Sequence, residues 1–217
     1  MKAKRNKADR SGLTVVEVLM VIAVVLALAV AVILPALSKA SPNRHRPSCV
    51  NNLKQVALSF RIYANDNNDR YPTRVPDAEG GAKESTERGG LFRAFQVLSN
   101  ELSVPRSVIC PAERRPLATN WATLRNSNVS YFIGLDATDI RPNSILSGDR
   151  DIAENGQLLS GTVHFTTNRP VAWHKLLHKE GGNIALADGS VQQTTTATLR
   201  QLLANTGDTT NRVLFPQ

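Results

Sequence analysis

The sequence is poor in cysteine, in aromatic residues and in long apolar runs. Two of its 217 residues are cysteine, and 5% are aromatic. Only one uncharged run is long enough to cross a bilayer, which excludes a polytopic membrane protein. Charged residues make up 20% of the chain and apolar residues 41%, which excludes wholesale disorder. The length suits one domain, or one domain with an appendage.

The positive charge is concentrated at the N-terminus. The net charge is +8, and residues 1–12 hold five basic side chains against Asp9, a net of +4. The other 205 residues therefore hold the remaining +4, without a dense basic stripe. A nucleic-acid partner is not expected, because such a protein clusters its basic residues on the folded part.

The uncharged run covers residues 18–38. A helix of 21 residues spans about 31 Å, close to the hydrocarbon thickness of a bilayer. The pattern predicts a basic leader at 1–12, a transmembrane helix at 13–40 with its N-terminus in the cytoplasm, and export of the rest. The alternative is a cleaved secretory signal, whose apolar region is only about 7–15 residues long.

A proline-rich break follows at 41–47, and an exported domain is expected at 48–217. Residues 49–65 predict an amphipathic helix, because their apolar positions form one stripe. A second short helix is expected from 91 to 102. These two stripes are Leu53, Val56, Ala57, Phe60, Tyr63 and Ala64, and then Leu91, Phe95, Leu98 and Leu102.

Beyond residue 107 the pattern changes to short extended segments, expected at 107–110, 128–134, 145–147, 162–166, 184–187 and 190–194. Asp188-Gly189 between the last two predicts a two-residue hairpin turn with both positions at positive φ. A final helix at 198–204 and a polar tail complete the prediction. The expected fold class is α+β with an antiparallel sheet.

Glu17 lies one residue before the uncharged run. Deep in lipid and without a partner, a carboxylate costs about 2–4 kcal/mol. It can instead lie ionised at the headgroup level. A cut after Gly12 would create an α-amino group at Leu13, one helical turn from Glu17, and the two charges could pair between neighbouring subunits.

The segment SGLTVVEVLMVIAVVLALAVAVILPAL resembles the class III signal of type IV prepilins and of type II secretion pseudopilins. The resemblance implies that a membrane peptidase cuts after Gly12 and methylates Leu13, and that Glu17 guides assembly into a filament. Leu13 replaces the usual phenylalanine, and Pro35 falls one place later than the usual proline.

A second resemblance covers most of the chain. Nine residues separate His178 from Asp188-Gly189. The motifs Cys-x-x-Asn-Leu-Lys-Gln, Tyr-Ala-Asn-Asp and Cys-Pro begin at Cys49, Tyr63 and Cys110. This order is similar to a pilin-like family common in Planctomycetes and Verrucomicrobia. The resemblance implies a pilin-like globular domain. An aspartate before a glycine, such as Asp188, is more often a turn residue than a ligand.

Cys49 and Cys110 both lie in the exported part. An oxidising compartment favours a disulfide between them, which would close a loop of about 60 residues and stabilise the fold by about 3–4 kcal/mol. Two buried free thiols are the alternative. Neither cysteine has the Cys-x-x-Cys spacing of a redox or zinc site, and no metal ligand is assigned.

The acidic run at 66–69 could offer oxygen ligands to calcium, the one cofactor considered. It lacks the glycine and terminal glutamate of an EF-hand, and a helix stop explains it equally well. A hydrolase or metal site would need the fold to gather three histidines with three aspartates. These are His164, His174, His178, Asp149, Asp151 and Asp188. No catalytic motif accompanies them, so an enzyme is not expected.

The combined expectation is a pilin-like subunit, with a type II secretion pseudopilin favoured over a surface pilin. Its partners would be the prepilin peptidase and methyltransferase, other pilin or pseudopilin subunits, and the inner membrane. It would cross that membrane once, with its domain in the periplasm, and then enter a periplasmic or surface filament. The alternative is an uncleaved, membrane-anchored extracytoplasmic binding domain that does not polymerise.

Overall fold

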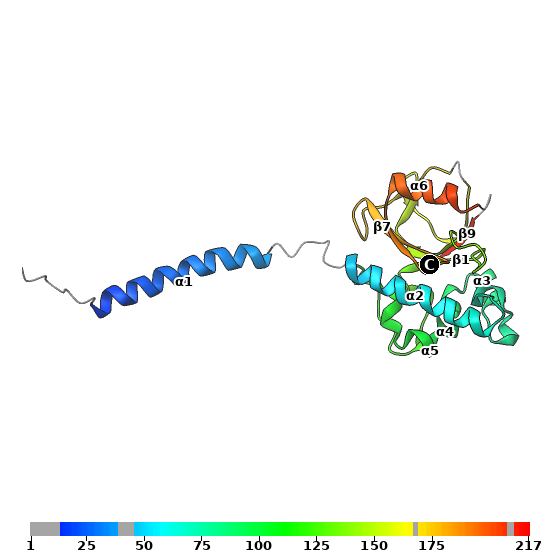
Figure 1. Ribbon diagram of the computed structural model, residues 1–217, viewed down its shortest axis with the longest axis horizontal. Helices are drawn as coiled ribbons and strands as arrows, with labels where there is room; N and C mark the ends of the chain where they lie inside the picture. Colours follow the sequence, from blue (N-terminus) through cyan, green and yellow to red (C-terminus); the bar gives the residue numbers. More distant parts are fainter. Residues whose placement is uncertain (1–13, 39–45, 167–168, 208–210) are drawn as a thin grey trace, which may run out of the picture. The chain divides into compact units, whose positions relative to one another are not determined.

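The computed structural model describes residues 14–38, 46–166, 169–207 and 211–217, except for the side chains of 32–38 and 46. The chain separates into two compact units, Met1–Ser41 and Pro42–Gln217 (Figure 1). Helices and antiparallel strands together make the α+β fold class that the sequence predicts.

The first unit contains helix α1 (Val15–Ser38), within the range where the sequence predicts a helix. Thr14 and Glu17 cap it reciprocally. The Glu17 carboxylate accepts hydrogen bonds from the Thr14 backbone N–H (2.8 Å) and hydroxyl (3.0 Å), and the Glu17 N–H donates to the Thr14 hydroxyl (3.3 Å). Within the described residues, no helix combines the length and the apolar character that a membrane crossing needs.

The second unit begins with helix α2 (Arg46–Asp66). It includes the last two residues of the predicted proline-rich break, because Pro47 lies in its first turn, where a missing N–H costs nothing. Residues 41–45 lie outside the described ranges. All six residues of the predicted apolar stripe are buried, so the predicted amphipathic helix is confirmed.

Shorter helices follow. They are α3 (Lys83–Glu87), α4 (Leu91–Val97), α5 (Ser99–Leu102) and α6 (Thr196–Asn205), with 3₁₀ helices η2 (Pro72–Arg74), η3 (Asp77–Glu79), η4 (Pro105–Val108), η5 (Trp121–Thr123) and η6 (Asn126–Asn128). The second predicted helix is thus two helices, α4 and α5, joined at Leu98. The last predicted helix is α6, which Thr195 caps.

Two antiparallel sheets complete the domain. The strands are β1 (Tyr131–Gly134), β2 (Ile145–Asp149), β3 (Ile152–Glu154), β4 (Gln157–Leu158), β5 (Gly161–Phe165), β6 (Val171–Trp173), β7 (Gly181–Leu186), β8 (Val191–Thr195) and β9 (Asn211–Phe215). The large sheet has the order β5-β9-β1-β2-β7-β8, and the small one β4-β3-β6.

Three details of the sequence prediction are wrong. No strand forms at 107–110, because residues 107 and 108 belong to η4, where Pro105 fixes φ at the start of a tight turn. The predicted polar tail contains β9, which lies inside the large sheet. The β7–β8 hairpin is present, but only Gly189 of its turn has positive φ (87°), and the loop is longer than two residues.

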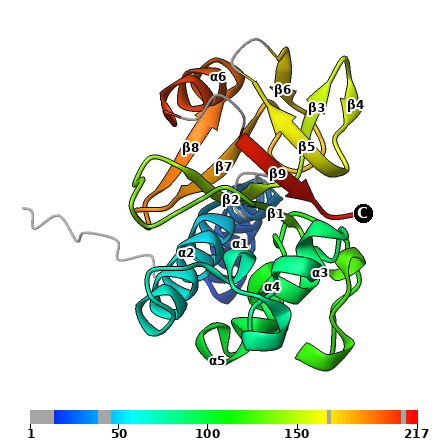
Figure 2. The same ribbon diagram turned by 90° about the vertical axis from the view of Figure 1, so that its right-hand side faces the viewer.

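The strands β1, β2 and β7 in the middle of the large sheet are buried throughout, and other elements cover both faces of the sheet (Figure 2). Side chains alternate along each strand, so Tyr131 and Ile133 join the core beneath α2, α4 and α5, whereas Phe132 joins the opposite core. The opposite core contains Leu199 of α6 and Trp173 of the small sheet. The domain therefore has three layers, with the large sheet in the middle.

Candidate functional site

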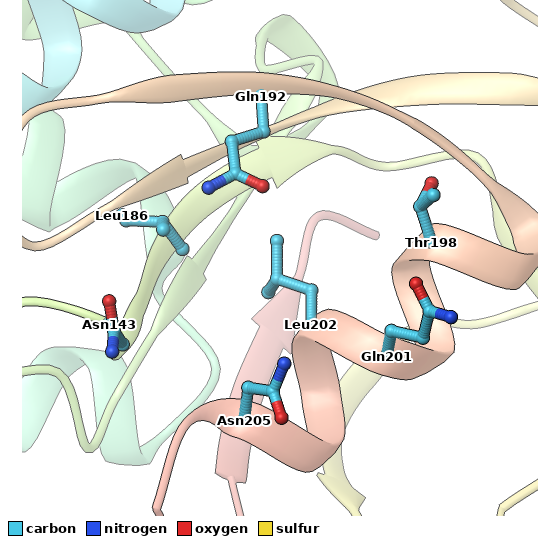
Figure 3. A pocket seen from close by; sticks show the side chains of 7 residues that line it. All are labelled: Asn143, Leu186, Gln192, Thr198, Gln201, Leu202 and Asn205. Atoms are coloured by element: carbon cyan, nitrogen blue, oxygen red, sulfur yellow. The ribbon is translucent and has the colours of Figure 1, made fainter.

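A pocket of about 310 Å³ lies between α6 and the β7–β8 hairpin (Figure 3). Its lining consists of Asn143, Leu186, Gln192, Thr198, Gln201, Leu202 and Asn205. These side chains supply amides, a hydroxyl and apolar surface, but no acid, base or strong nucleophile. The pocket therefore offers hydrogen bonds to a neutral ligand and no catalytic group.

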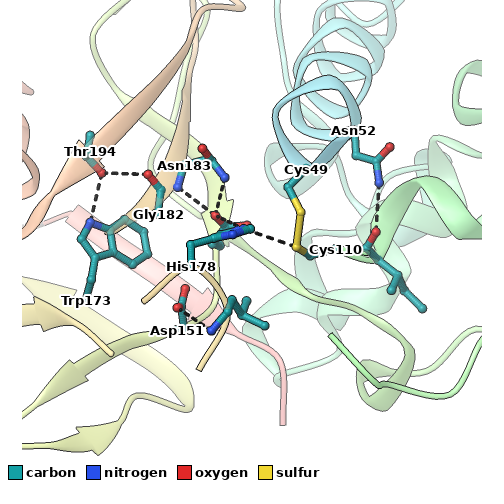
Figure 4. A network of polar contacts seen from close by, with 12 residues as sticks. Cys49, Asn52, Cys110, Asp151, Trp173, His178, Gly182, Asn183 and Thr194 are labelled. Carbon is teal, nitrogen blue, oxygen red and sulfur yellow. Dashed lines mark hydrogen bonds and ion pairs between the residues drawn. A yellow bond between two sulfur atoms is a disulfide. The ribbon is translucent and has the colours of Figure 1, made fainter. Parts of the chain in front are cut away.

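A buried polar cluster lies on the other side of the large sheet, where α2 meets it (Figure 4). A disulfide joins Cys49 in the first turns of α2 to Cys110, just after η4, with their Cα atoms 5.1 Å apart. Both cysteines have no exposed surface. The disulfide that the sequence analysis weighed against free thiols is thus present.

Asn52 adds a second tie between the same two segments. Its side-chain N–H₂ group donates to the carbonyl oxygen of Ile109 over 2.9 Å. Residues three apart on a helix share a face, so Cys49 and Asn52 both point at the segment that ends in Cys110. The Cys-x-x-Asn spacing therefore fixes α2 to this segment at two points.

His178 reaches the cluster from the loop between β6 and β7. Its Nε2 atom lies 3.4 Å from Cys110 Sγ and 3.4 Å from Asp149 Oδ2. The two side chains are 1% and 0% exposed. Asp149 stands at the end of β2, and the same Oδ2 atom accepts hydrogen bonds from the Asn183 backbone N–H (2.8 Å) and amide group (2.7 Å). The β2–β7 pairing thus places Asn183 beside Asp149.

Asp151 holds the loop that carries His178. Its carboxylate accepts a hydrogen bond from the Leu177 N–H over 3.2 Å, and its carbonyl oxygen accepts one from the His174 N–H over 2.7 Å. Burial raises the pKa of Asp151 to about 7, while the backbone N–H groups of Leu177 and His178 oppose the rise. The loop is therefore fixed on both sides of its midpoint.

The cluster offers two sulfur atoms, one imidazole nitrogen and one carboxylate oxygen, all within 4.8 Å of one another. No other such group of metal-ligating side chains occurs among the described residues. With the cysteines oxidised and every member buried, these atoms cannot touch a substrate. The arrangement is structural in the oxidised state and has the chemistry of a metal site in the reduced one.

The structure does not bring Asp188 to His178. Asp188 is exposed in the β7–β8 turn, where its carboxylate accepts from the Ser190 N–H over 2.8 Å. Its carbonyl oxygen accepts from the Arg61 guanidinium of α2 over 2.9 Å. Gly189 supplies the left-handed backbone that closes the turn. The two ends of the His-x9-Asp-Gly pattern therefore serve separate contacts. His178 lies beside the disulfide that holds the start of α2, and Asp188 binds Arg61 further along the same helix.

The remaining candidates lie apart from the cluster. His164 is exposed on β5, and His174 is half-buried. In the acidic run, Asp66 and Asp69 are exposed, and Asn68 and Asp69 have positive φ where α2 ends. The Asp69 N–H donates to the Ala64 carbonyl over 2.9 Å, as in a helix stop. Gly12 and Leu13 lie outside the described residues.

Sequence reasoning missed Asp149 as the partner of His178 and Asn183 as the partner of Asp149. The one sequence signal for Asp149 was that it is among the three aspartates that a hydrolase or metal site would need beside the histidines. No protein-family model, curated protein or solved structure matches this chain.

Proposed function

We propose that this protein is a pilin-like subunit, and specifically a type II secretion pseudopilin. The observation that carries the proposal is the N-terminal order of a basic leader, Gly12, Glu17 and an uncharged run at 18–38. In this proposal a prepilin peptidase cuts after Gly12 and the new N-terminus at Leu13 is methylated. The subunit then leaves the inner membrane for a filament.

The arrangement of the exported domain supports this role. A filament subunit needs its globular domain attached firmly to the helix that enters the filament. Here α2, which follows the N-terminal unit in sequence, is tied to the domain by the Cys49–Cys110 disulfide and by Asn52 and Arg61. The membrane crossing itself, with the N-terminus in the cytoplasm, stays an expectation from the sequence.

One observation favours the alternative of an uncleaved, membrane-anchored binding domain. The Thr14–Glu17 capping box gives the Glu17 carboxylate a local role that requires no second subunit. If capping is the whole role of Glu17, this carboxylate is no evidence for filament assembly.

The deciding experiment is the intact mass and N-terminal sequence of the protein purified from membranes of cells that contain a prepilin peptidase. We expect a chain that begins at Leu13 and is heavier by one methyl group. A chain that still begins at Met1 would refute the pilin proposal and favour the anchored domain. A start beyond residue 36 would identify a secretory signal.

Two variants separate the assembly role of Glu17 from its capping role. Glu17→Ala removes the carboxylate, whereas Thr14→Ala keeps the carboxylate and removes the hydroxyl that completes the cap. The pilin proposal expects Glu17→Ala alone to abolish recovery of the subunit in sheared filaments. Equal behaviour of the two variants would leave capping as the role of Glu17.

A further inference from the structure

The Cys49, Cys110, Asp149 and His178 side chains come from four separate segments of the domain. They lie at the start of α2, after η4, at the end of β2 and between β6 and β7. Their sulfur, nitrogen and oxygen donor atoms all fall within 4.8 Å of one another. Two thiolates with an imidazole and a carboxylate form a donor set that suits zinc, which binds sulfur, nitrogen and oxygen ligands tetrahedrally.

Two of the observed spacings fit the edges of such a tetrahedron, and the two bonded sulfur atoms would move apart on reduction. Zinc bonds of about 2.3 Å to sulfur and about 2.0 Å to nitrogen or oxygen give edges of about 3.5 Å for sulfur–nitrogen and about 3.3 Å for nitrogen–oxygen. His178 Nε2 lies 3.4 Å from both Cys110 Sγ and Asp149 Oδ2. The contact to Asp149 Oδ2 is longer than a good nitrogen–oxygen hydrogen bond, and one nitrogen faces both the sulfur and the oxygen atom.

The surroundings already orient the ligands. Asn183 donates two hydrogen bonds to Asp149 Oδ2, and the Asp151 carboxylate holds the loop next to His178 through the Leu177 N–H. Partners of this kind fix ligand orientation in metal sites. The 5.1 Å between the Cα atoms of Cys49 and Cys110 lets both sulfurs reach one ion after rotation about their Cα–Cβ bonds.

We propose that the reduced protein binds one zinc ion through Cys49, Cys110, Asp149 and His178, and that this zinc centre and the disulfide are alternative states of the same four side chains. A newly made chain carries two thiols, and zinc binding releases both thiol protons to solvent. Counting Asp149 as a carboxylate and His178 as neutral, the cluster keeps a net charge of −1 with or without the ion. Zinc binding therefore adds no net charge to the buried site.

Conversion to the disulfide is a two-electron oxidation. A disulfide-containing oxidoreductase accepts two electrons from the two thiolates, the sulfur–sulfur bond forms, the oxidant takes up two protons as two thiols, and the zinc ion leaves. Either state joins α2 to the segment after η4, so the domain is fastened before and after oxidation. The inference does not depend on filament assembly.

The test uses the full chain in detergent micelles, reduced with a phosphine and titrated with Co²⁺ alone and then with Zn²⁺ alone. We expect one Co²⁺ per chain, with the visible absorption of tetrahedral cobalt and thiolate charge-transfer bands, and displacement by one Zn²⁺. The oxidised chain should show neither. Absence of this spectrum in the reduced chain, or equal binding by the oxidised chain, would overturn the proposal.

Ligand identity is tested with His178→Gln and Asp149→Asn. Both should weaken zinc binding by the reduced chain at least tenfold, whereas His174→Gln, a matched histidine outside the cluster, should bind as the wild type does. Circular dichroism of each oxidised variant checks its fold. Unchanged binding by folded His178→Gln and Asp149→Asn would place the ion elsewhere and overturn the assignment.

If these variants fail to fold even when oxidised, X-ray absorption of the zinc-loaded wild type decides. Two sulfur and two nitrogen or oxygen atoms bound to zinc would support the proposal, and any other set of ligand atoms would refute it.

Discussion

The two faces of the large sheet are covered by helices that are held in different ways. On one face, α2 is fixed by a disulfide and by polar side chains, Asn52 and Arg61 among them. On the other, α6 packs through three leucines, and the small sheet packs through Trp173. Two hydrogen bonds also join α6 to β6, from Arg200 to the Val171 carbonyl oxygen (3.0 Å) and from the Trp173 N–H to the Thr196 hydroxyl (3.1 Å). With only two cysteines in the chain, α6 can have no covalent tie of its own.

The difference follows from what each helix is connected to. Helix α6 lies between two strands of the large sheet, β8 and β9, so its backbone is anchored at both ends. Helix α2 has the domain on its C-terminal side only, and the other compact unit precedes it. A helix anchored at both ends needs no cross-link, whereas a helix anchored at one end gains most from one.

The largest expected effect comes from removing the cross-link. The double variant Cys49→Ser, Cys110→Ser should lose about 4 kcal/mol of unfolding free energy, because the closed loop of 61 residues no longer restricts the unfolded chain. Urea denaturation followed by tryptophan fluorescence measures it. Wild type reduced in the presence of a chelator is the control and should lose a similar amount. A loss below about 1 kcal/mol would show that α2, like α6, is held by packing.

On the opposite face, Gly182→Ala should cost about 3 kcal/mol, because a Cβ on this β7 residue would overlap the Trp173 ring. The Trp173 indole is fixed by its hydrogen bond to Thr194 (3.1 Å) and cannot move aside freely. Gly156→Ala is the control, since its Cβ would meet nothing and only its left-handed φ of 80° adds strain, about 1–2 kcal/mol. Equal losses would mean that the contact between β7 and the small sheet is loose.

Removing a polar tie of α2 should have a smaller effect. Asn52→Ala deletes the hydrogen bond to Ile109 and leaves that carbonyl oxygen without its partner, at a cost of about 1.5 kcal/mol. Asn51→Ala is the matched control, because this neighbour is exposed, and it should change stability by less than about 0.5 kcal/mol. If both variants match the wild type in thermal unfolding, the hydrogen bond from Asn52 contributes nothing to holding α2.

The smallest effect concerns the ion pair that fixes β9. The Asp136 carboxylate accepts hydrogen bonds from the Arg212 backbone N–H (2.8 Å) and guanidinium (2.8 and 3.0 Å). Partial burial raises the pKa of Asp136, but the hydrogen bonds and charge of Arg212 outweigh it, so the pKa is lowered overall. Because the pKa of Asp136 is lower in the folded state than its unfolded-state value near 4, the ionised carboxylate stabilises the fold above about pH 4. This contribution is lost as the pH falls below about 4 and Asp136 takes up a proton in the folded state.

Between pH 6 and pH 2, wild type should therefore lose about 1 kcal/mol more unfolding free energy than Asp136→Asn. Glu180→Gln, which removes an exposed ion pair with Lys175, should follow the wild-type pH profile. A profile of Asp136→Asn that coincides with wild type would mean that β9 is held by its sheet hydrogen bonds alone.

The periodic pattern in the sequence predicted helix α2 well, whereas it did not predict α3 or the break between α4 and α5. The stripe from Leu53 to Ala64 is buried as expected, because a helix presents every third or fourth residue to the core. The β9 strand was missed because Asn211 and Arg212 make its start look polar and its buried Val213, Leu214 and Phe215 form a run too short for a periodic signal. Only the topology of the sheet places this strand between β5 and β1.

The cluster around the disulfide was predictable in part. The two cysteines and His178 were identified as residues of interest, but their convergence depends on a contact across 68 positions of sequence. Asp149 and Asn183 face each other only because of the β2–β7 register, which no local motif encodes. The sequence therefore supplied candidate ligands, and the strand pairing determines which of them meet.

The disulfide also changes how the protein would respond to a pulling force. Traction applied through the N-terminal segment enters the domain at Cys49 and crosses directly to Cys110, so the intervening chain carries no tension. At about 3.5 Å per residue, the disulfide shortens the extension of the domain on forced unfolding by roughly 200 Å. A peptide bond cut anywhere between the two cysteines would likewise leave both fragments joined, and the molecule would keep its mechanical continuity.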